Sequence, residues 1–358
     1  MCRPKGVCAP AMVDLAIIAD DLTGALDAAA PFAARGIPTV VALTPSALPQ
    51  ALATGARVIG VSTNSREIAP AAATRAVRLA VSLLPTGTAL FKKVDSRLKG
   101  NIAAELDAIP HRRSLVAPAI PAFGRITRNR QIVGFGITEP VDIAARLGRH
   151  AASALIPDVE GAADMERALL QPHDLDVGAR GLSEVMARLM APDAVAPVPT
   201  YSTTSAFCVI GSTDPITLAQ LDHLRRTIPD LTHIPAPNGI APPMTATSGL
   251  TVIQAVPGAA PATALSVAAQ LGTSLLRLSP PPGSLFVISG GATAQIILQM
   301  LGVETLDVLG EIQPGLPIAC GGGLTVVTKS GGFGKPDSLS RLFAPEPGAM
   351  KLLQSNDE

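Results

Sequence analysis

The stretch FKKVDSRLKGN, residues 91–101, decides how we expect this chain to fold. The apolar run TALF, residues 88–91, leads directly into it, which is typical of a buried strand that ends in a polar turn. In an open α/β sheet, ligands bind just beyond the carboxyl ends of the strands. Lysines beside an aspartate suit an anionic substrate, because the cations neutralise its charge and the carboxylate can accept a proton. The alternative is a solvated charged loop.

Three more strands in the first half are expected to end in polar turns. Residues 13–19 run into Asp20 and Asp21, residues 57–61 into STNSR at 62–66, and residues 114–119 into PAFGR at 121–125. Adjacent carboxylates repel each other unless a ligand, a cation or a helix N-terminus compensates, and helix capping would explain only Asp21. The fork of Arg66 suits carboxylates and phosphates, although a helix cap at Ser65 beside a solvated Arg66 would also explain that turn. Four such strand ends predict a common cleft at the carboxyl edge of one parallel sheet.

Other elements of the first half complete this pattern. We expect strands at 38–43 and 154–157, helices at 70–84 and 178–190, and a small hairpin within 126–140. The glycine-rich start of the last helix, GARGL at 178–182, could also face an anion.

The second half is expected to form a separate nucleotide-binding domain. Residues 191–206 are rich in Pro, Ser and Thr without periodicity, which predicts domains at 1–190 and 207–358 with a linker between them. Three strands should then end in glycine-containing turns, namely GSTDP at 211–215, SGGATA at 289–294 and KSGGFG at 329–334. Residues 235–249 are expected to be loop. Neither the P-loop nor the GxGxxG spacing is present, and each turn alone could be structural, but together they favour a nucleotide phosphate site.

The composition excludes several classes of protein. The 358 residues carry a formal net charge of +0 and no Trp, which argues against a nucleic-acid-binding surface or an anionic-membrane surface. No signal peptide and no apolar run long enough to span a bilayer is evident, so we expect a cytoplasmic protein without a membrane partner. The four cysteines, Cys2, Cys8, Cys208 and Cys320, are scattered, which favours free thiols in a reducing compartment.

The chain resembles the four-carbon acid sugar kinases, which include 3-oxo-tetronate, D-threonate and D-erythronate kinases. The resemblance rests on nine motifs in order: IIADDLTGA (17–25), TNSR (63–66), KKVDSRLKGN (92–101), APAIPAFGR (117–125), VGARGL (177–182), GSTDPITLAQ (211–220), SGGATA (289–294), PGLP (314–317) and KSGGFG (329–334). It implies an α/β fold of two domains, each a mainly parallel sheet flanked by helices, with the active site in the cleft between them. It also implies ATP-dependent phosphorylation of the terminal hydroxyl of a four-carbon sugar acid, with the acid on the first domain and ATP on the second.

The same motifs carry the expected binding residues. The acid-binding set is Asp21, Arg66, Lys93, Val94, Asp95, Ser96 and Asn101, and the ATP-binding set is Ser212, Gly290, Gly291, Ala292, Thr293, Lys329, Gly331 and Gly334. Two positions depart from the family, because Arg97 stands where a small hydroxyl residue is usual and Lys99 where Arg is usual. The region after Arg125 is also shorter than usual, and these departures bear on the choice of acid and on subunit contacts more than on the class of reaction.

Phosphoryl transfer needs charge neutralisation, in-line positioning and a group that orients the attacking hydroxyl. We expect Asp95 to be that catalytic group, with Asp20 or Asp21 as the alternative base or as a Mg²⁺ anchor through water. Lys93 and Arg66 would hold the carboxylate of the acid. No dedicated metal site is evident, so Mg²⁺ would be held mainly by the phosphates of ATP. A non-catalytic sensor of a phosphorylated sugar acid, or a hydrolase or lyase acting on one, are the alternatives, and a homodimer is one possible assembly.

Overall fold

The computed structural model describes residues 13–194, 196–203, 205–243, 249–343 and 351–352. These residues form two compact units, which divide between Ala196 and Pro197. We call them the N unit and the C unit, and each is described by itself. Each is a mainly parallel sheet flanked by helices, which confirms the predicted fold class.

The N unit is built on a parallel sheet with the strand order β2-β3-β1-β4-β10-β5-β9. Its strands are β1 (Leu15–Ala19), β2 (Thr39–Ala42), β3 (Val58–Ser62), β4 (Ala89–Lys93), β5 (Ser114–Ala117), β9 (Ala154–Leu155) and β10 (Leu175–Gly178). From β1 the chain goes to β2 and β3 on one side and then to β4 on the other, so the strand order reverses at β1. Ligands of open α/β sheets bind at such a reversal, beyond the carboxyl ends of the strands.

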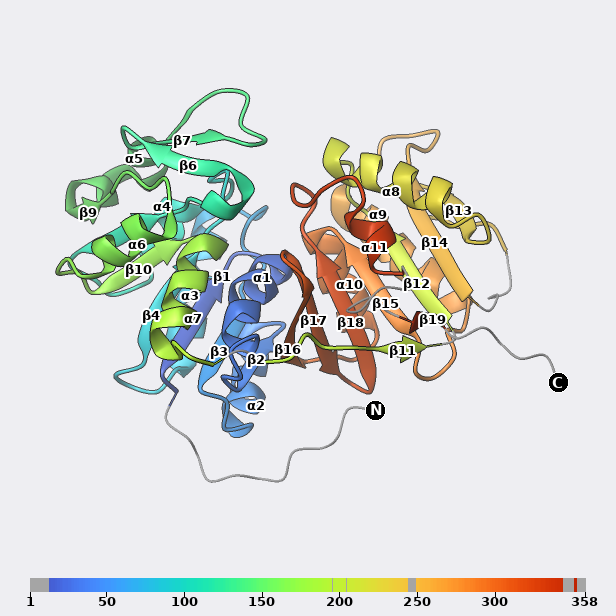
Figure 1. Cartoon of the computed structure of the whole chain (residues 1–358), viewed down its shortest axis with the longest axis horizontal. Helices are drawn as coiled ribbons and strands as arrows, with labels where there is room; N and C mark the ends of the chain where they lie inside the picture. The colour runs from blue at the N-terminus through green and yellow to red at the C-terminus, as the bar shows by residue number, and fades with distance from the viewer. Residues whose placement is uncertain (1–12, 195, 204, 244–248, 344–350, 353–358) are drawn as a thin grey trace. The chain divides into compact units, whose positions relative to one another are not determined.

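Helices cover both faces of this sheet (Figure 1). They are α1 (Leu22–Ala33), α2 (Leu48–Ala53), α3 (Pro70–Leu83), α4 (Ile102–Leu106), α5 (Ile143–Leu147), α6 (Ala162–Leu169) and α7 (Arg180–Met190). Helices α1, α6 and α7 pack together on one face, whereas α2, α3 and α4 pack together on the other, over side chains such as Ile18, Ile59 and Val116. Pro31 lies in the last turn of α1 and does not end the helix, which continues to Ala33.

Two features of the N unit bear on the predicted elements. The expected hairpin is present as β6 (Arg125–Arg128) and β7 (Gln131–Gly134), and β8 (Val141–Asp142) adds a third antiparallel strand. Strand β10 was not expected, yet it lies between β4 and β5 in the sheet. It is short, and Asp176 interrupts its apolar run, so the sequence pattern gave little sign of it.

The C unit has a second sheet, with the order β13-β14-β12-β15-β18-β17-β16. Its strands are β12 (Ser205–Ile210), β13 (Thr232–Pro237), β14 (Gly249–Val256), β15 (Leu285–Ser289), β16 (Thr305–Gln313), β17 (Leu316–Gly321) and β18 (Leu324–Lys329). Five neighbouring strands of this sheet run parallel to one another, namely β13, β14, β12, β15 and β18. Strand β17 is antiparallel to both of its neighbours, β18 and β16. The strand order reverses between β12 and β15, which again marks a binding position at the carboxyl edge.

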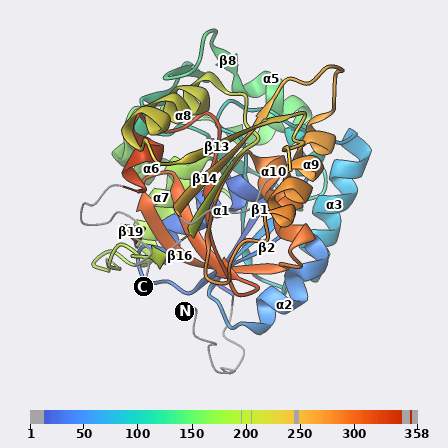
Figure 2. The ribbon, with the colours of Figure 1, turned by 90° about the vertical axis from the view of Figure 1, so that its right-hand side faces the viewer.

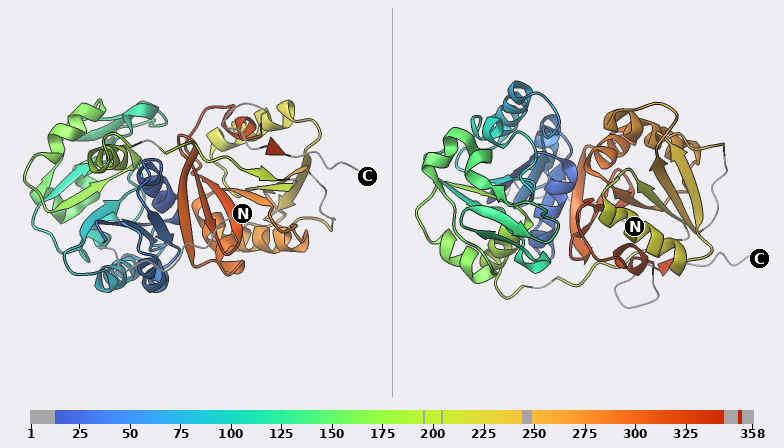
Figure 3. Two further views of the ribbon diagram at one scale, coloured as in Figure 1. Left: turned by 60° about the horizontal axis from the view of Figure 1, so that its bottom comes forward. Right: turned by 90° about the horizontal axis from the view of Figure 1, so that it is seen from above.

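Helices also cover both faces of the C-unit sheet. They are α8 (Pro215–Thr227), α9 (Ala264–Arg277), α10 (Gly291–Met300) and α11 (Ser338–Arg341). Figure 2 looks toward the edge strand β13 and shows α8 on one side of the sheet, with α9 and α10 on the other. The left view of Figure 3 shows the same layers, with α11 on the side of α8. A short pair, β11 (Ser202–Thr203) with β19 (Lys351–Leu352), lies outside this sheet.

Two expectations are corrected by the structure, one about a loop and one about the cysteines. The predicted loop at 235–249 is only partly loop, because β13 extends to Pro237 and β14 begins at Gly249. Cys208 is a free buried thiol as expected, but Cys320 is disulfide-bonded, so the expectation of four free thiols is wrong. Cys2 and Cys8 lie outside the described residues. Among the helices that the structure describes, none is long and apolar enough to span a membrane.

Candidate functional site

The turns after β1 and β3 meet in a cluster of buried charges. The guanidinium of Arg66 donates from Nε to Asp20 Oδ2 at 2.8 Å and from Nη2 to Asp20 Oδ1 at 2.9 Å. Its Nη1 lies 2.6 Å from Asp21 Oδ2. Asp21 also caps α1, because its Oδ1 accepts a hydrogen bond from Gly24 N at 2.6 Å. Arg66 thus explains how two neighbouring carboxylates coexist at a strand end, and it lies with them as the sequence predicted.

The two carboxyl groups have different proton affinities. Burial opposes ionisation of Asp20, but the charges of Arg66, Lys92 and Lys93 outweigh it and hold the pKa of Asp20 below its usual value. Burial, together with the adjacent Asp20 charge, prevails over Arg66 at Asp21 and raises the pKa of Asp21. Burial lowers the pKa of Arg66 less than Asp21 and Asp20 raise it, so it stays a cation. Asp20 is therefore the firmer anion and Asp21 the better proton acceptor.

Lys93 ends β4 on the face of the sheet that α1 covers. Its ammonium donates to Val94 O at 2.9 Å. If Gly24 of α1 carried a Cβ atom, that atom would lie 3.4 Å from Lys93 Nζ. Among the described residues this is the one hydrogen bond of Lys93 Nζ, which leaves two of its three N–H groups for an anion. Lys93 is buried, so an anion at this position would meet a poorly solvated cation.

The neighbouring Lys92 points to the opposite face, as alternation along a strand requires. Its ammonium lies 2.8 Å from Glu105 Oε2 on α4, and both side chains are buried. The other oxygen of Glu105 accepts a short hydrogen bond from Ser65 Oγ, next to Arg66. This network ties the ends of β3 and β4 to α4. Sequence reasoning did not include Glu105, although it lies four residues beyond the end of the KKVDSRLKGN motif.

The turn after β4 holds the remaining residues of the expected acid-binding set. Asp95 is half-buried, and its Oδ1 accepts a hydrogen bond from Arg97 N at 2.8 Å. Val94 is buried and bonds to Gly178 through its backbone N–H. The amide of Asn101 donates to the carbonyl oxygens of Ser65, at 2.8 Å, and Ile68, at 2.7 Å. Asn101 therefore holds the turn that carries Arg66.

The β6–β7 hairpin connects to this turn through Arg125. Its buried guanidinium donates from Nη1 to Ser96 Oγ at 2.5 Å and from Nε and Nη2 to the carbonyl of Phe135. A Cβ on Gly136 would lie 3.0 Å from Arg97 Nη2 and 3.1 Å from Arg125 Nη2. Arg97, one of the two residues that depart from the family, thus lies beside the hairpin.

The glycines of the GARGL motif, Gly178 at the end of β10 and Gly181 at the start of α7, have a packing role. A Cβ on Gly178 would lie 2.9 Å from the carbonyl oxygen of Ala117, and a Cβ on Gly181 would overlap the carbonyl oxygen of Ala119. Both glycines are needed because α7 packs closely against the end of β5. That the start of this helix faces an anion stays a prediction.

The three predicted glycine turns of the C unit meet at one edge, since β12, β15 and β18 are adjacent in the sheet. Gly290 has φ +110, and a Cβ there would lie 3.5 Å from Ser212 N. The first residues of α10 follow at once, namely Gly291, Ala292 and Thr293. A Cβ on Gly331 would lie 2.5 Å from Ser212 Oγ. Backbone N–H groups at a helix start beside bare glycines form a suitable surface for phosphate oxygens.

Lys329 lies beneath this edge rather than on it. Its side chain is 1% exposed, and its Nζ donates to Thr217 Oγ1 at 2.9 Å, Ser330 O at 2.9 Å and Gly331 O at 3.2 Å. At the other end of the turn, a Cβ on Gly334, at φ +93, would lie 2.7 Å from Gln220 Nε2. Gln220 Nε2 itself holds the carbonyl oxygens of Phe333 and Lys335. Side chains of α8 therefore fix both ends of the turn.

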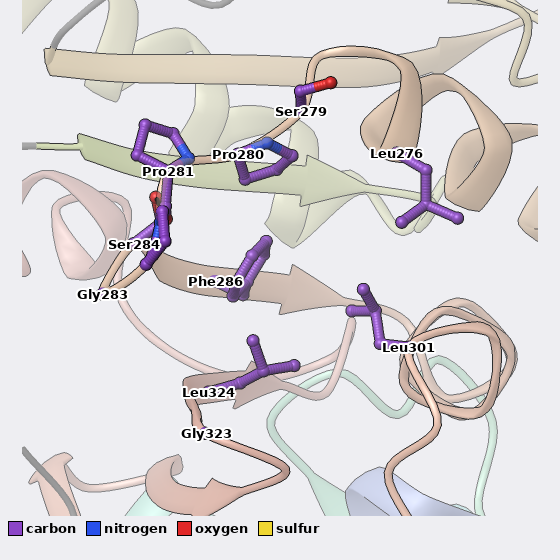
Figure 4. A pocket seen from close by; sticks show the side chains of 11 residues that line it. Leu276, Ser279, Pro280, Pro281, Gly283, Ser284, Phe286, Leu301, Gly323 and Leu324 are labelled. Atoms are coloured by element: carbon purple, nitrogen blue, oxygen red, sulfur yellow. Dashed lines mark hydrogen bonds between the residues drawn. The ribbon is translucent and has the colours of Figure 1, made fainter.

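A separate cavity of about 400 Å³ lies at the opposite edge of the C-unit sheet, near the first residues of β15 and β18. Figure 4 shows its wall of apolar side chains, with Phe286, Leu301 and Leu324 around the hollow and Pro280 and Pro281 on its rim. No charged residue lines this cavity, and its mostly apolar wall suits an apolar group better than a phosphate or a carboxylate.

Comparisons with known proteins agree with this division of chemistry. A family model described as a sugar-binding N-terminal domain matches residues 15–135, and one described as a nucleotide-binding C-terminal domain matches residues 242–339. A D-threonate kinase of Bordetella bronchiseptica is 30% identical over an alignment 397 residues long, which includes gaps and covers 91% of this chain and 96% of that protein. A D-erythronate kinase of Heliobacterium modesticaldum is 36% identical over 162 residues, covering 42% of this chain and 36% of that protein.

Solved structures give the same picture for the fold. A Salmonella typhimurium protein superposes with a TM-score of 0.69 at 18% identity, covering 91% of this chain and 98% of that one. A Haemophilus influenzae protein superposes with a TM-score of 0.61 at 19% identity, covering 90% and 97%. At these identities the likeness concerns the fold alone.

Proposed function

The chain belongs to the four-carbon acid sugar kinase family, and from this premise we propose that it transfers a phosphoryl group from ATP to the terminal hydroxyl of a four-carbon sugar acid. Threonate, erythronate and 3-oxo-tetronate are the acids named for its relatives. The observation that carries the proposal is the buried cluster of Asp20, Asp21, Arg66 and Lys93 at the strand reversal of the N unit. A four-carbon polyol has few distinguishing features besides its carboxylate, so a site for it needs a fixed, poorly solvated cation.

Lys93 is the cation best placed for the acid carboxylate in this proposal. Its ammonium keeps two N–H groups for a ligand, as described above. Arg66, expected to share this role, already uses three of its five N–H groups on Asp20 and Asp21. Arg66 therefore contributes its remaining two N–H groups to the acid and, in addition, holds the two aspartates in place.

Asp95 remains our choice for the group that orients the attacking hydroxyl. Both oxygens of Asp20 are held by Arg66, and those of Asp21 by Gly24, Thr23 and Arg66. Asp95 is half-buried at a turn, where a bound hydroxyl can reach it. A positioned carboxylate of this kind accepts the proton as the hydroxyl attacks. Asp21, whose pKa is raised by burial, is the alternative base.

The nucleotide is proposed to bind at the glycine turns of the C unit, with Ser212, Gly290 to Thr293 and Gly331 around its phosphates. Bound Mg²⁺ would neutralise charge on those phosphates.

The experiment is a coupled assay of ATP consumption over the stereoisomers of threonate, erythronate and 3-oxo-tetronate. We expect one acid to consume ATP in equimolar amount, and the matching neutral polyol to be a poor substrate. If ATP and an acid both bind but no ATP is consumed, the chain is a sensor and the proposal is wrong. Release of phosphate from an acid phosphate without ATP would instead indicate a hydrolase.

A further inference from the structure

The buried Lys329 has no N–H group left for a ligand. A lysine ammonium has three N–H donors, and those of Lys329 go to Thr217 Oγ1, Ser330 O and Gly331 O. Thr217 Oγ1 in turn donates to Gly331 O at 2.9 Å, so this carbonyl accepts from both α8 and β18. The glycine turn is thereby held from below, and its carbonyl oxygens are drawn away from the edge where Ser212 and Gly290 lie.

We infer that Lys329 is a positioning residue, which shapes the turn at 330–334 for nucleotide phosphates and contributes its charge from beneath without touching them. The inference rests on the proposed function, because it assumes that the turn binds ATP. The burial supports it, since a side chain that is 1% exposed cannot reach a ligand without rearranging the turn. Carbonyl oxygens repel phosphate oxygens, so drawing Gly331 O downward leaves the N–H side of the turn for the anion.

This arrangement predicts a pH dependence of ATP binding. Burial lowers the pKa of Lys329 from the ordinary 10.5 to about 8, against the opposing effects of Asp214 and Cys208, the titratable groups that face it. Burial raises the pKa of the Cys208 thiol to about 12, so it stays neutral when Lys329 titrates. Above pH 8 the lysine loses its charge and one of three N–H donors. ATP affinity should then fall, whereas the affinity for the acid should not.

The test compares Lys329→Met and Thr217→Val with Lys335→Met, which removes an exposed lysine from the far end of the same turn. Direct titration of each folded variant with ATP and excess Mg²⁺, without acid, gives Kd at about pH 7 and about pH 9. Loss of a hydrogen bond to a charged group corresponds to about tenfold or more in affinity. We expect the wild-type Kd to rise by that factor with pH, and Lys329→Met to bind weakly at both values. Thr217→Val should be weakened at the lower pH, and Lys335→Met should follow the wild type.

Several results would overturn the inference. The inference is wrong if Lys329→Met binds ATP at pH 7 as tightly as the wild type does. It is also wrong if Lys329→Met and Lys335→Met lose equal ATP affinity. If Lys329→Met fails to fold, unchanged affinity in Thr217→Val decides against it. Because binding is measured without acid, the kinase proposal can fail separately: a chain that binds ATP with the expected pH dependence but consumes none with any acid would contradict only that proposal.

Discussion

Arg66 should be essential for the stability of the N unit at neutral pH, and less so in acid. Its fork makes three contacts with two buried carboxylates, Asp20 at 2% exposure and Asp21 at 7%. Removing one partner of a buried ion pair typically costs about 3–5 kcal/mol, because the other charge is left uncompensated. The Arg66 side chain is 22% exposed, so we expect Arg66→Ala to lose about 3 kcal/mol, at the lower end of that range.

The pH dependence follows from the two aspartates. In the wild type the depressed pKa of Asp20 gives stability that is present above its unfolded pKa and lost only as the pH falls below it. Without Arg66, burial and mutual repulsion would raise the pKa of both carboxyl groups above their unfolded values. Both ionised carboxylates then destabilise the folded variant at high pH, and this destabilisation disappears as they bind protons. The loss relative to the wild type should therefore shrink between pH 8 and pH 5, by about 1.4 kcal/mol for each unit by which a pKa rises.

Denaturant unfolding can assign this loss to the N unit. The chain has one tyrosine and no tryptophan, and Tyr201 belongs to the C unit, so its fluorescence follows that unit while far-UV circular dichroism follows both. Arg66→Ala should shift the dichroism transition and leave the tyrosine transition in place. The control is Arg57→Ala, which breaks an ion pair with Asp14 whose side chains are 48% and 34% exposed, and which should cost at most about 1 kcal/mol. A loss below about 1 kcal/mol at pH 8, or an equal loss at pH 5, would refute the reasoning.

Three further substitutions test the site. Glu105→Gln leaves the Lys92 ammonium buried without its carboxylate, so it should destabilise the N unit by about 3 kcal/mol in the same unfolding assay. The control, Asp107→Asn at the exposed end of α4, should cost at most about 1 kcal/mol. Equal losses in the two variants would count against the buried network. Asp95→Asn should lower kcat by about 10²–10⁴-fold with ATP affinity unchanged, and a near-normal kcat would transfer the role to Asp21. The Cβ of Gly331→Val would lie 2.5 Å from Ser212 Oγ, so this variant should raise KM for ATP about tenfold or more with little change in KM for the acid. The control is Gly161→Val, whose Cβ would meet nothing within 4 Å and which should change neither KM. Equal effects of Gly331→Val on both substrates would contradict the assignment of ATP to the C unit.

The sequence was most informative where a buried strand ends in an unusual group of polar residues. Such a pattern predicts both the strand and the edge at which its end lies, and the turns after β1, β3 and β4 do meet there. Strand β10 escaped because its four residues include Asp176, and a short mixed run is not distinguishable from a loop. The alternating burial of β16 is clear in the structure, but that strand was not predicted, although the PGLP motif at 314–317 directly follows it.

The direction of each long side chain could not be predicted from the pattern. An arginine after a strand suits an external carboxylate and an internal one equally well, and only the distances show that Arg66 holds Asp20 and Asp21. In the same way, a lysine before a glycine turn suggests a phosphate contact, whereas Thr217 on α8 shows that Lys329 points beneath the turn. The expected domain limits, and the roles of individual residues in binding and catalysis, stay predictions.

The link between the hairpin and Ser96 has a consequence for how such enzymes diversify. Arg125 stands at the first residue of β6 and joins the carbonyl of Phe135, just after β7, to the hydroxyl of Ser96. A longer or shorter β6–β7 segment would move Phe135. Because Arg125 binds both Phe135 and Ser96, Ser96 would then shift as well, with no substitution at Asp95 or Lys93. If Ser96 contacts the acid as proposed, insertions and deletions in this hairpin would change which acid is accepted without changing the residues proposed for phosphoryl transfer.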